Sequence, residues 1–276
     1  MDQNQNQNQN QKEYEEWKQK KLTHLEEYQD QMAEGEKKPE KEPRKSLGQE
    51  IWEYVRMIII VVLAVVLIQN FIVINARIPS ESMQDTIMVG DQIFGNRLAY
   101  KFGDPARYDI VIFRYPDDES ELFIKRIIGL PGETVHIRED GVYIDDADQP
   151  LSQDFCPETP VYLDEDMVSR IFSSMTDAVN DGSVVSSTGE DGTVTEISYD
   201  ADGTITEISY TVPEGSYFVM GDNRNHSHDS RYWNSKCVAE DKIVGKAFLR
   251  YWPLTAIKVL NTDAGGYYEP KAEAGA

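Results

Sequence analysis

Three short segments of the chain hold the residues that could do chemistry. Ser82 lies in the segment Pro-Ser-Glu-Ser-Met of residues 79–83, Lys125 follows three apolar residues, and residues 221–231 form a polar turn. A serine hydroxyl is a poor nucleophile until a base removes its proton. A lysine amine can be this base when it is neutral, and burial lowers a lysine pKa towards neutrality. The three segments therefore indicate a serine nucleophile, an amine base and a polar brace.

Other bases and other roles are open from composition alone. Histidine is the usual base, and His226 and His228 flank Ser227 in the polar turn. These two histidines could also bind zinc, but no third ligand lies at a motif spacing, so we interpret them as solvent-facing turn residues. Lys125 and Arg126 should point to opposite faces of a strand, which directs one of them inward. The simpler interpretation is that both are exposed cations near a sheet edge.

An uncharged apolar run precedes the serine segment. Residues 57–76 are mostly Ile, Val and Leu, and roughly 20 such residues match the ~30 Å hydrocarbon core of a bilayer. We predict a polar tail over 1–50 and a transmembrane helix over 51–76, since the run is too long and too far from Met1 for a cleavable signal peptide. More basic residues precede the run than follow it, which predicts a cytoplasmic N-terminus and an extracytoplasmic domain. The preceding basic residues are Lys37, Lys38, Lys41, Arg44, Lys45 and Arg56.

The charge balance restricts the classes of partner. The net charge is −22, and residues 77–276 contribute 17 basic and 36 acidic residues to it. Such an acidic domain argues against nucleic acid, which is bound through basic patches. Cys156 and Cys237 are the only cysteines. In an oxidising compartment they could pair, and the sequence leaves paired and free cysteines equally open.

The downstream region, 77–276, reads as one mainly β domain with an insertion at about 146–212. Short β-rich runs lie at 108–114, 122–128, 133–138, 216–220 and 243–252, and residues 129–132 form a tight turn. Within the insertion we expect a helix over 164–179. The segment 191–199 recurs as 202–210, and the two copies predict a β-hairpin joined by Asp-Ala-Asp-Gly.

Four motifs, in this order behind the anchor, resemble the conserved boxes of the bacterial type I signal peptidases, the membrane-bound Ser/Lys leader peptidases. Residues 79–83 are similar to the nucleophile box, 107–113 to a structural box, 123–132 to the general-base box and 221–231 to the last box. The resemblance extends to about Trp252 and excludes the tail and the insertion. It implies a β-barrel or coiled-sheet catalytic domain and an endopeptidase that removes signal peptides from exported preproteins at a bacterial cell membrane.

The resemblance also implies a role for each matching residue. Ser82 would attack the scissile carbonyl, and Lys125 would take its proton. The hydroxyl of Ser80 would help the Ser82 backbone N–H to stabilise the oxyanion, and Ser227 would orient the lysine. The supporting ion pair would be Asp229 with Arg231, and the pocket for an Ala-x-Ala cleavage site would consist of Ile78, Pro79, Met83, Ile87, Phe123 and Ile124. Each of those apolar residues could equally be part of an ordinary core.

The chain departs from the family pattern at one position. Where the family has Pro-Thr after Ser-Met-x, this chain has Asp85 and Thr86. A carboxylate close to Lys125 would favour the charged amine and oppose catalysis, so we expect Asp85 to point outward. Trp252 matches a family position near a membrane-facing rim, with a place in the core as the alternative.

Two other functions are compatible with these residues. One is a self-cleaving Ser/Lys peptidase, against which the membrane span weighs. The other is a catalytically silent or attenuated anchored interaction protein, which Asp85 and the acidic insertion would fit. On the main interpretation the partners are secreted preproteins and the lipid bilayer, and no metal or organic cofactor is expected. The sequence does not determine the oligomeric state.

Overall fold

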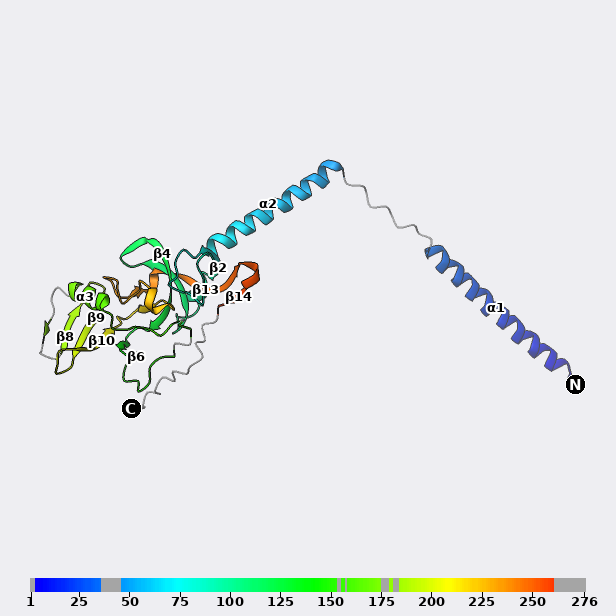
Figure 1. Cartoon of the computed structure of the whole chain (residues 1–276). Helices are drawn as coiled ribbons and strands as arrows, with labels where there is room; N and C mark the ends of the chain where they lie inside the picture. The colour runs from blue at the N-terminus through cyan, green and yellow to red at the C-terminus, as the bar shows by residue number, and fades with distance from the viewer. Residues whose placement is uncertain are drawn as a thin grey trace. The chain divides into compact units, whose positions relative to one another are not determined.

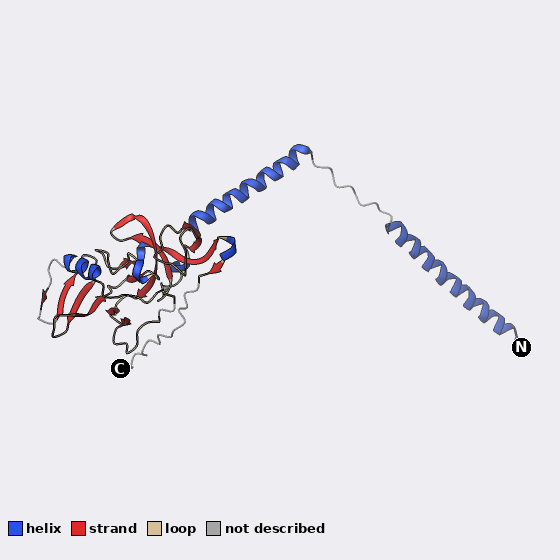
Figure 2. Cartoon of the chain, viewed as in Figure 1, coloured by secondary structure: helices blue, strands red, loops and turns tan. Residues whose placement is uncertain are grey.

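The chain folds into two compact units, whose boundary lies inside a helix. The computed structural model describes residues 3–35, 46–152, 155–156, 158–174, 179–180 and 184–260. The first unit, residues 1–61, holds α1 (Gln3–Gly35) and the start of α2 (Leu47–Phe71). The second unit, residues 62–276, holds the rest of α2 and every described strand (Figures 1 and 2).

Helix α2 is the one described helix that is long and apolar enough to cross a membrane, with a mean hydropathy of 2.5. It begins at Leu47, four residues before the predicted start, because Ser46 and Gln49 cap it. The N–H of Gln49 donates to Ser46 Oγ (3.3 Å), and the N–H of Ser46 donates to Gln49 Oε1 (3.0 Å). This reciprocal pair is a capping box, which satisfies two free donors at the helix start.

The predicted end of this helix, at Ala76, is wrong. The helix ends at Phe71, and Val73–Arg77 form strand β1. The reason is tertiary, because β1 pairs with β2 (Gln92–Asn96) and Ile74 is buried in the core below them. Hydropathy cannot separate an apolar strand from the end of an apolar helix.

The larger sheet has eight strands in the order β1-β2-β13-β3-β4-β11-β12, with β14 beside β13, and its described pairs are antiparallel. Besides β1 and β2 its strands are β3 (Ile110–Tyr115), β4 (Asp118–Gly129), β11 (Ser216–Met220), β12 (Val238–Ala239), β13 (Ile243–Trp252) and β14 (Lys258–Val259). Short 3₁₀ turns lie at η1 (Ala99–Lys101), η2 (Arg224–His226), η3 (Glu240–Lys242) and η4 (Leu254–Ala256).

The second sheet joins the predicted insertion to the domain. Its strand order is β6-β5-β10-β9-β8-β7. The strands are β5 (Thr134–Arg138), β6 (Gly141–Ile144), β7 (Val179–Asn180), β8 (Val184–Thr188), β9 (Val194–Tyr199) and β10 (Ile205–Thr211). The predicted hairpin is confirmed, since β9 and β10 are antiparallel neighbours. Strand β10 also pairs with β5, so the insertion extends a sheet that begins outside it.

Helix α3 (Glu165–Ser174) covers part of this second sheet. Met167 and Ile171 of α3 are fully buried in one core cluster with Ile197 and Ile208 of the hairpin. Asp164 caps the helix, because its Oδ1 accepts the N–H of Met167 at 2.8 Å. The predicted helix over 164–179 is too long: residues 175–178 lie outside the described residues, and 179–180 form β7.

The mainly β prediction is confirmed, and each of the five predicted β runs contains a strand, β3, β4, β5, β11 and β13. The turn at 129–132 is also present, with Gly132 at a φ of 80°. Three connections of this fold matter for function. The loop 78–91 joins β1 to β2, Lys125 lies within β4, and the polar segment 221–231 follows β11, which pairs with β4.

Candidate active site

The loop that carries Ser82 is held by its buried neighbours. Its two ends are joined by the N–H of Ile78, which donates to the carbonyl of Asp91 at 3.0 Å. Met83, the next residue after Ser82, is fully buried, as is Ile87, and both pack in one cluster with β2 and β3. A side chain between such anchors keeps one position, so the Ser82 hydroxyl is fixed relative to the sheet.

Strand β4 brings Lys125 to this hydroxyl. Lys125 pairs in register with Val111 of β3 and is only 4% exposed. Its Nζ lies 2.6 Å from Oγ of Ser82, which is itself 5% exposed. A nucleophile and its base must lie within hydrogen-bond reach of each other, and these two residues, 43 positions apart in the chain, meet that condition.

The surroundings of Lys125 favour a neutral amine. Burial is the largest influence and lowers the pKa of Lys125 to about 8. The carboxylates of Asp229 and Asp222 raise the pKa, and the Arg231 guanidinium lowers it again. A base with a pKa near 8 is partly neutral at physiological pH, as proton transfer from a serine requires.

The segment after β11 approaches Ser82 so closely that only glycine fits at position 221. A Cβ there would lie 2.2 Å from Ser227 Oγ and 2.4 Å from the carbonyl oxygen of Ser82. Two residues on, the N–H of Asn223 donates to the same Ser82 carbonyl at 3.1 Å. The polar segment is therefore packed directly against the backbone of the nucleophile.

Asp229 and Arg231 form the predicted ion pair, and both are completely buried. Arg231 donates through Nε and Nη2 to the two carboxylate oxygens at 2.8 and 2.9 Å. The N–H of Gly221 also donates to Asp229 (2.9 Å). Burial by itself raises the pKa of Asp229, but Arg231 and the hydrogen bonds outweigh it and hold the pKa below its ordinary value. A charged bridge thus ties the segment 221–231 together.

Ser80 and Ser227 are the remaining polar residues of the predicted site. Ser80 is exposed, and its Oγ lies 3.4 Å from Ser82 Oγ, so either hydroxyl can donate to the other. Ser227 is buried against Gly221, but no hydrogen bond joins its hydroxyl to Lys125 among the described residues. The predicted lysine-orienting bond of Ser227 is therefore not present in this structure.

The residues predicted to line an apolar substrate pocket differ in burial. Three are buried in the cluster below the loop, Ile78, Met83 and Ile87, and Ile124 packs against that cluster. Phe123 is half-buried in a different cluster, where its ring stacks on Tyr115 and lies 5.5 Å from Lys125 Nζ. Pro79 is exposed. Ile78, Met83, Ile87 and Ile124 are therefore also part of the hydrophobic core, as the alternative interpretation proposed.

Lys125 and Arg126 are both buried, which corrects the expectation of one inward residue or of two exposed cations. Arg126 is 2% exposed and donates through Nε and Nη2 to the carboxylate of Asp222, at 2.8 and 2.6 Å. Asp222 also accepts from the hydroxyl of Thr86 at 2.6 Å. Sequence reasoning missed this second ion pair, although a charged residue next to Lys125 in an apolar strand was a signal for it.

At position 85, where the chain departs from the family pattern, the backbone conformation suits the residue that is present. Asp85 is exposed, as expected, and the charges that shift the pKa of Lys125 are Asp229, Asp222 and Arg231. The backbone of Asp85 has a φ of 72°. Proline cannot adopt this angle, whereas aspartate reaches the left-handed region at moderate cost. The local loop conformation therefore fits the residue that this chain has.

The two cysteines do not form a disulfide with each other, which answers the question left open by the sequence. Cys156 is half-buried and Cys237 is buried, where the Thr193 hydroxyl donates to its Sγ at 3.3 Å. His226 and His228 are exposed, in agreement with turn residues that face solvent. Among the described residues no group of three or more His, Cys, Asp or Glu could hold a metal ion.

Comparison with known proteins gives a consistent result. The family model described as signal peptidase, peptidase S26, matches residues 51–252. The probable signal peptidase I-2 of Synechocystis is 30% identical over 75% of this chain and 76% of its own length. The signal peptidase I of Pseudomonas aeruginosa is 32% identical over 73% of each chain. A solved signal peptidase I from Enterococcus faecalis shares 29% identity over 52% of this chain and 96% of its own, with a TM-score of 0.28.

Proposed function

The chain belongs to the signal peptidase family, peptidase S26, and is a serine endopeptidase that removes signal peptides from exported preproteins; from this premise we propose that Ser82 is its nucleophile and Lys125 its general base. The observation that carries the proposal is the 2.6 Å between Lys125 Nζ and Ser82 Oγ, with both side chains buried. Burial also lowers the pKa of Lys125 to about 8, which suits a base near neutrality.

The reaction uses the same two groups twice. Neutral Lys125 accepts the hydroxyl proton as Ser82 Oγ attacks the scissile carbonyl carbon, and the resulting ammonium gives that proton to the leaving amine. A water molecule then attacks the acyl-enzyme while Lys125 removes its proton, which returns to Ser82 on release of the acid. The Ser80 hydroxyl and the Ser82 N–H are the oxyanion donors, and such a donor contributes about 3–4 kcal/mol to the transition state.

The Asp229–Arg231 pair keeps the base usable. An unpaired buried carboxylate would hold Lys125 in its charged form, because an opposite charge raises a lysine pKa. Arg231 neutralises Asp229 through two hydrogen bonds and lowers the pKa of Lys125 by its own charge. The Asp229–Arg231 ion pair thus braces the loop and still leaves Lys125 the neutral amine that the reaction needs.

The substrate is a preprotein with small residues before the cleavage point. Ile78, Met83, Ile87 and Ile124 pack together in one cluster that includes the residue next to Ser82. Pro79, Phe123 and Ile124, which reach solvent, form the shallow apolar surface for an Ala-x-Ala sequence, the pattern found before signal-peptide cleavage points, and the buried Ile78, Met83 and Ile87 form its floor.

The catalytic unit works at the outer surface of a bacterial membrane. Helix α2 is the anchor, the segment before it is cytoplasmic, and residues 77–276 form the extracytoplasmic catalytic domain. Apolar side chains exposed near the start of β2 and the end of β13 form the lipid-facing rim, since Gln92 pairs with Trp252. We define this rim by Met88, Val89, Trp252, Leu254 and Ile257. Trp252 is 47% exposed, which suits an amphipathic ring at an interface.

Cleavage of a precursor by the full chain in detergent tests the dyad. Ser82→Ala and Lys125→Ala should each lower kcat by at least about 10⁴-fold, and the double variant should be no slower than either single one, because residues that act as a unit are not additive. The matched controls are exposed residues of the same types, Ser120→Ala and Lys101→Ala, which should cleave at the wild-type rate.

Substantial turnover by Lys125→Ala would refute the assignment and make His226 or His228 the base to examine next. A wild-type chain that folds but cleaves no precursor would instead favour the silent interaction protein. The intact contact between Lys125 and Ser82 argues against that alternative, because nothing in a purely binding protein requires a buried amine beside a serine.

A further inference from the structure

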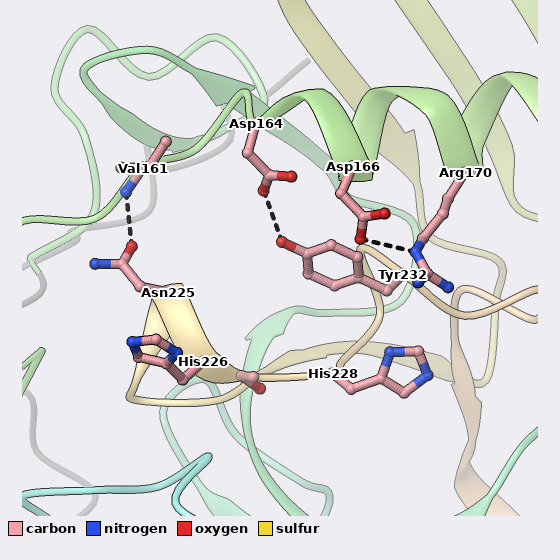
Figure 3. A pocket seen from close by; sticks show the side chains of 9 residues that line it. Val161, Asp164, Asp166, Arg170, Asn225, His226, His228 and Tyr232 are labelled. Atoms are coloured by element: carbon pink, nitrogen blue, oxygen red, sulfur yellow. Dashed lines mark hydrogen bonds and ion pairs between the residues drawn. The ribbon is translucent and has the colours of Figure 1, made fainter.

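An open pocket of about 550 Å³ lies between helix α3 of the insertion and the turn that carries Ser227. In Figure 3 the side chains of Asp164, Asp166 and Arg170 come from the helix on one side, and those of Asn225, His226 and His228 come from the turn on the other. The lining residues, which define the α3 pocket, are Val161, Asp164, Asp166, Arg170, Asn225, His226, Ser227, His228 and Tyr232.

The two walls of the α3 pocket are joined by hydrogen bonds. Asn225 Oδ1 accepts the N–H of Val161 at 2.9 Å, and its Nδ2 donates to the carbonyl of Thr159 at 3.2 Å. The Tyr232 hydroxyl donates to Asp164 Oδ2 at 2.7 Å. The insertion is therefore fastened to the catalytic turn on both sides of Ser227, and the opening between them has a fixed shape (Figure 3).

The charge of the pocket favours a cation. Asp166 is compensated by Arg170, whose Nε donates to its carboxylate at 2.9 Å. Asp164 accepts only from the neutral Tyr232 hydroxyl and the N–H of Met167 among the described contacts, so its charge is uncompensated. Partial burial lowers the pKa of His228, which disfavours a positive charge on this ring. The whole insertion, 146–212, has fifteen acidic residues and one basic residue, Arg170.

The pocket adjoins the active site through Ser227. Ser227 lines the pocket and also touches Gly221, next to the carbonyl of Ser82. The charge of Lys125 acts on the pKa of His228, which places the pocket within electrostatic range of the base. In the proposed reaction Lys125 gives its proton to the leaving nitrogen, so the chain after the cleavage point starts beside Lys125, and Ser227 and the α3 pocket lie within its reach.

We propose that the α3 pocket is a subsite for a lysine or arginine side chain among the first residues after the cleavage point of the preprotein. The inference rests on the proposed function, because it takes the direction of the substrate from the roles of Ser82 and Lys125. The insertion thereby contributes to substrate selection: its helix supplies the acidic wall, and the catalytic turn supplies the opposite one.

Precursors that differ at one residue test the subsite. Each of the first four residues after the cleavage point is made Lys, Gln or Glu in turn, and kcat/KM is measured with the full chain in detergent at low salt. At one or two positions the wild type should cleave the Lys precursor about fivefold to tenfold faster than the Glu precursor, the effect of one partly screened ion pair. Asp164→Asn should reduce this ratio to near one, because asparagine keeps the helix cap but not the charge.

Glu196→Gln is the matched control, since it removes one exposed negative charge of the same insertion outside the pocket, and it should keep the wild-type ratio. No Lys preference at any position, a preference that survives Asp164→Asn, or an equal loss in Glu196→Gln would overturn the proposal. Binding of the same peptides to the Ser82→Ala chain gives a readout without cleavage. Tighter binding of the Lys peptides by Ser82→Ala, together with a wild-type chain that cleaves no precursor, would refute the proposed function and keep the pocket, whereas equal binding of Lys and Glu peptides would refute the pocket alone.

Discussion

Replacing Lys125 by methionine should abolish cleavage and at the same time make the protein more stable near neutral pH. Lys125 is 4% exposed, and its ammonium form is disfavoured by burial more than it is favoured by Asp229 and Asp222. Methionine has a similar length and no charge, so it fills the same space without that cost. The wild type keeps the less stable residue because the reaction needs an amine whose pKa is low.

The pKa of Lys125 sets the size of the effect. The difference between the ordinary value of 10.5 and the value of about 8 corresponds to about 3 kcal/mol. Between these two values the unfolded chain binds the proton that the folded chain has lost, so wild-type stability rises with pH across this window. The advantage of Lys125→Met is therefore greatest below pH 8 and disappears as the pH approaches 10.5. At pH 7 a gain of 2–3 kcal/mol raises Tm by about 5–10 °C.

Thermal unfolding of the full chain in detergent, followed by near-UV circular dichroism between pH 6 and 10.5, measures this difference. Lys236→Met is the matched control. Lys236 is as buried as Lys125, and burial lowers its pKa to about 8 as well. Its Nζ, however, donates to the carbonyl of Arg231 and not to Ser82. Both variants should gain stability, and only Lys125→Met should lose cleavage. A Lys125→Met protein that is less stable than wild type at pH 7, or equally stabilised at pH 7 and 10.5, would refute the reasoning.

Three further results are expected. The kcat/KM of the wild type should rise with pH through an apparent pKa of about 8, because only the neutral amine of Lys125 is active; a profile still climbing at pH 10 would contradict this. Gly221→Ala should lower kcat by about 100-fold or more, since its Cβ would push the backbone of Ser82 or the side chain of Ser227 out of place; wild-type kinetics would show that the loop adjusts. Asp85→Pro should lower the free energy of unfolding by at least about 1 kcal/mol, and Asp85→Asn should leave it unchanged, because the φ of 72° excludes proline but admits asparagine. Urea unfolding measures both free energies, and equal stability of the two variants would contradict the prediction.

Much of the secondary structure was predictable because it depends on local patterns. Short β-rich runs between turn residues predicted the principal strands, and the repeated segment with its Asp-Ala-Asp-Gly turn predicted the β9–β10 hairpin, whose two copies pair as expected. The helix end at Phe71 was not predictable, since the apolar run continues past it through Ile72, Val73 and Ile74. Only the pairing of β1 with β2 and the burial of Ile74 make it a strand.

The motif order and the anchor follow from the sequence by itself, because they are properties of residue type and spacing along the chain, and the resemblance of those motifs to the family's boxes supplies the candidate residues of the site. The contacts are decided by tertiary structure. Lys125 meets Ser82 only because β3 and β11 flank β4 and the loop 78–91 folds over it.

How far the pKa of Lys125 falls depends on burial of its amine and on the charges of Asp229, Asp222 and Arg231. No local sequence pattern places these three residues beside Lys125. The same is true of the Arg126–Asp222 ion pair, which joins residues 96 positions apart. The physical reason is common to all of these features. Electrostatic energies depend on distance and desolvation, and both are set by how separate segments pack.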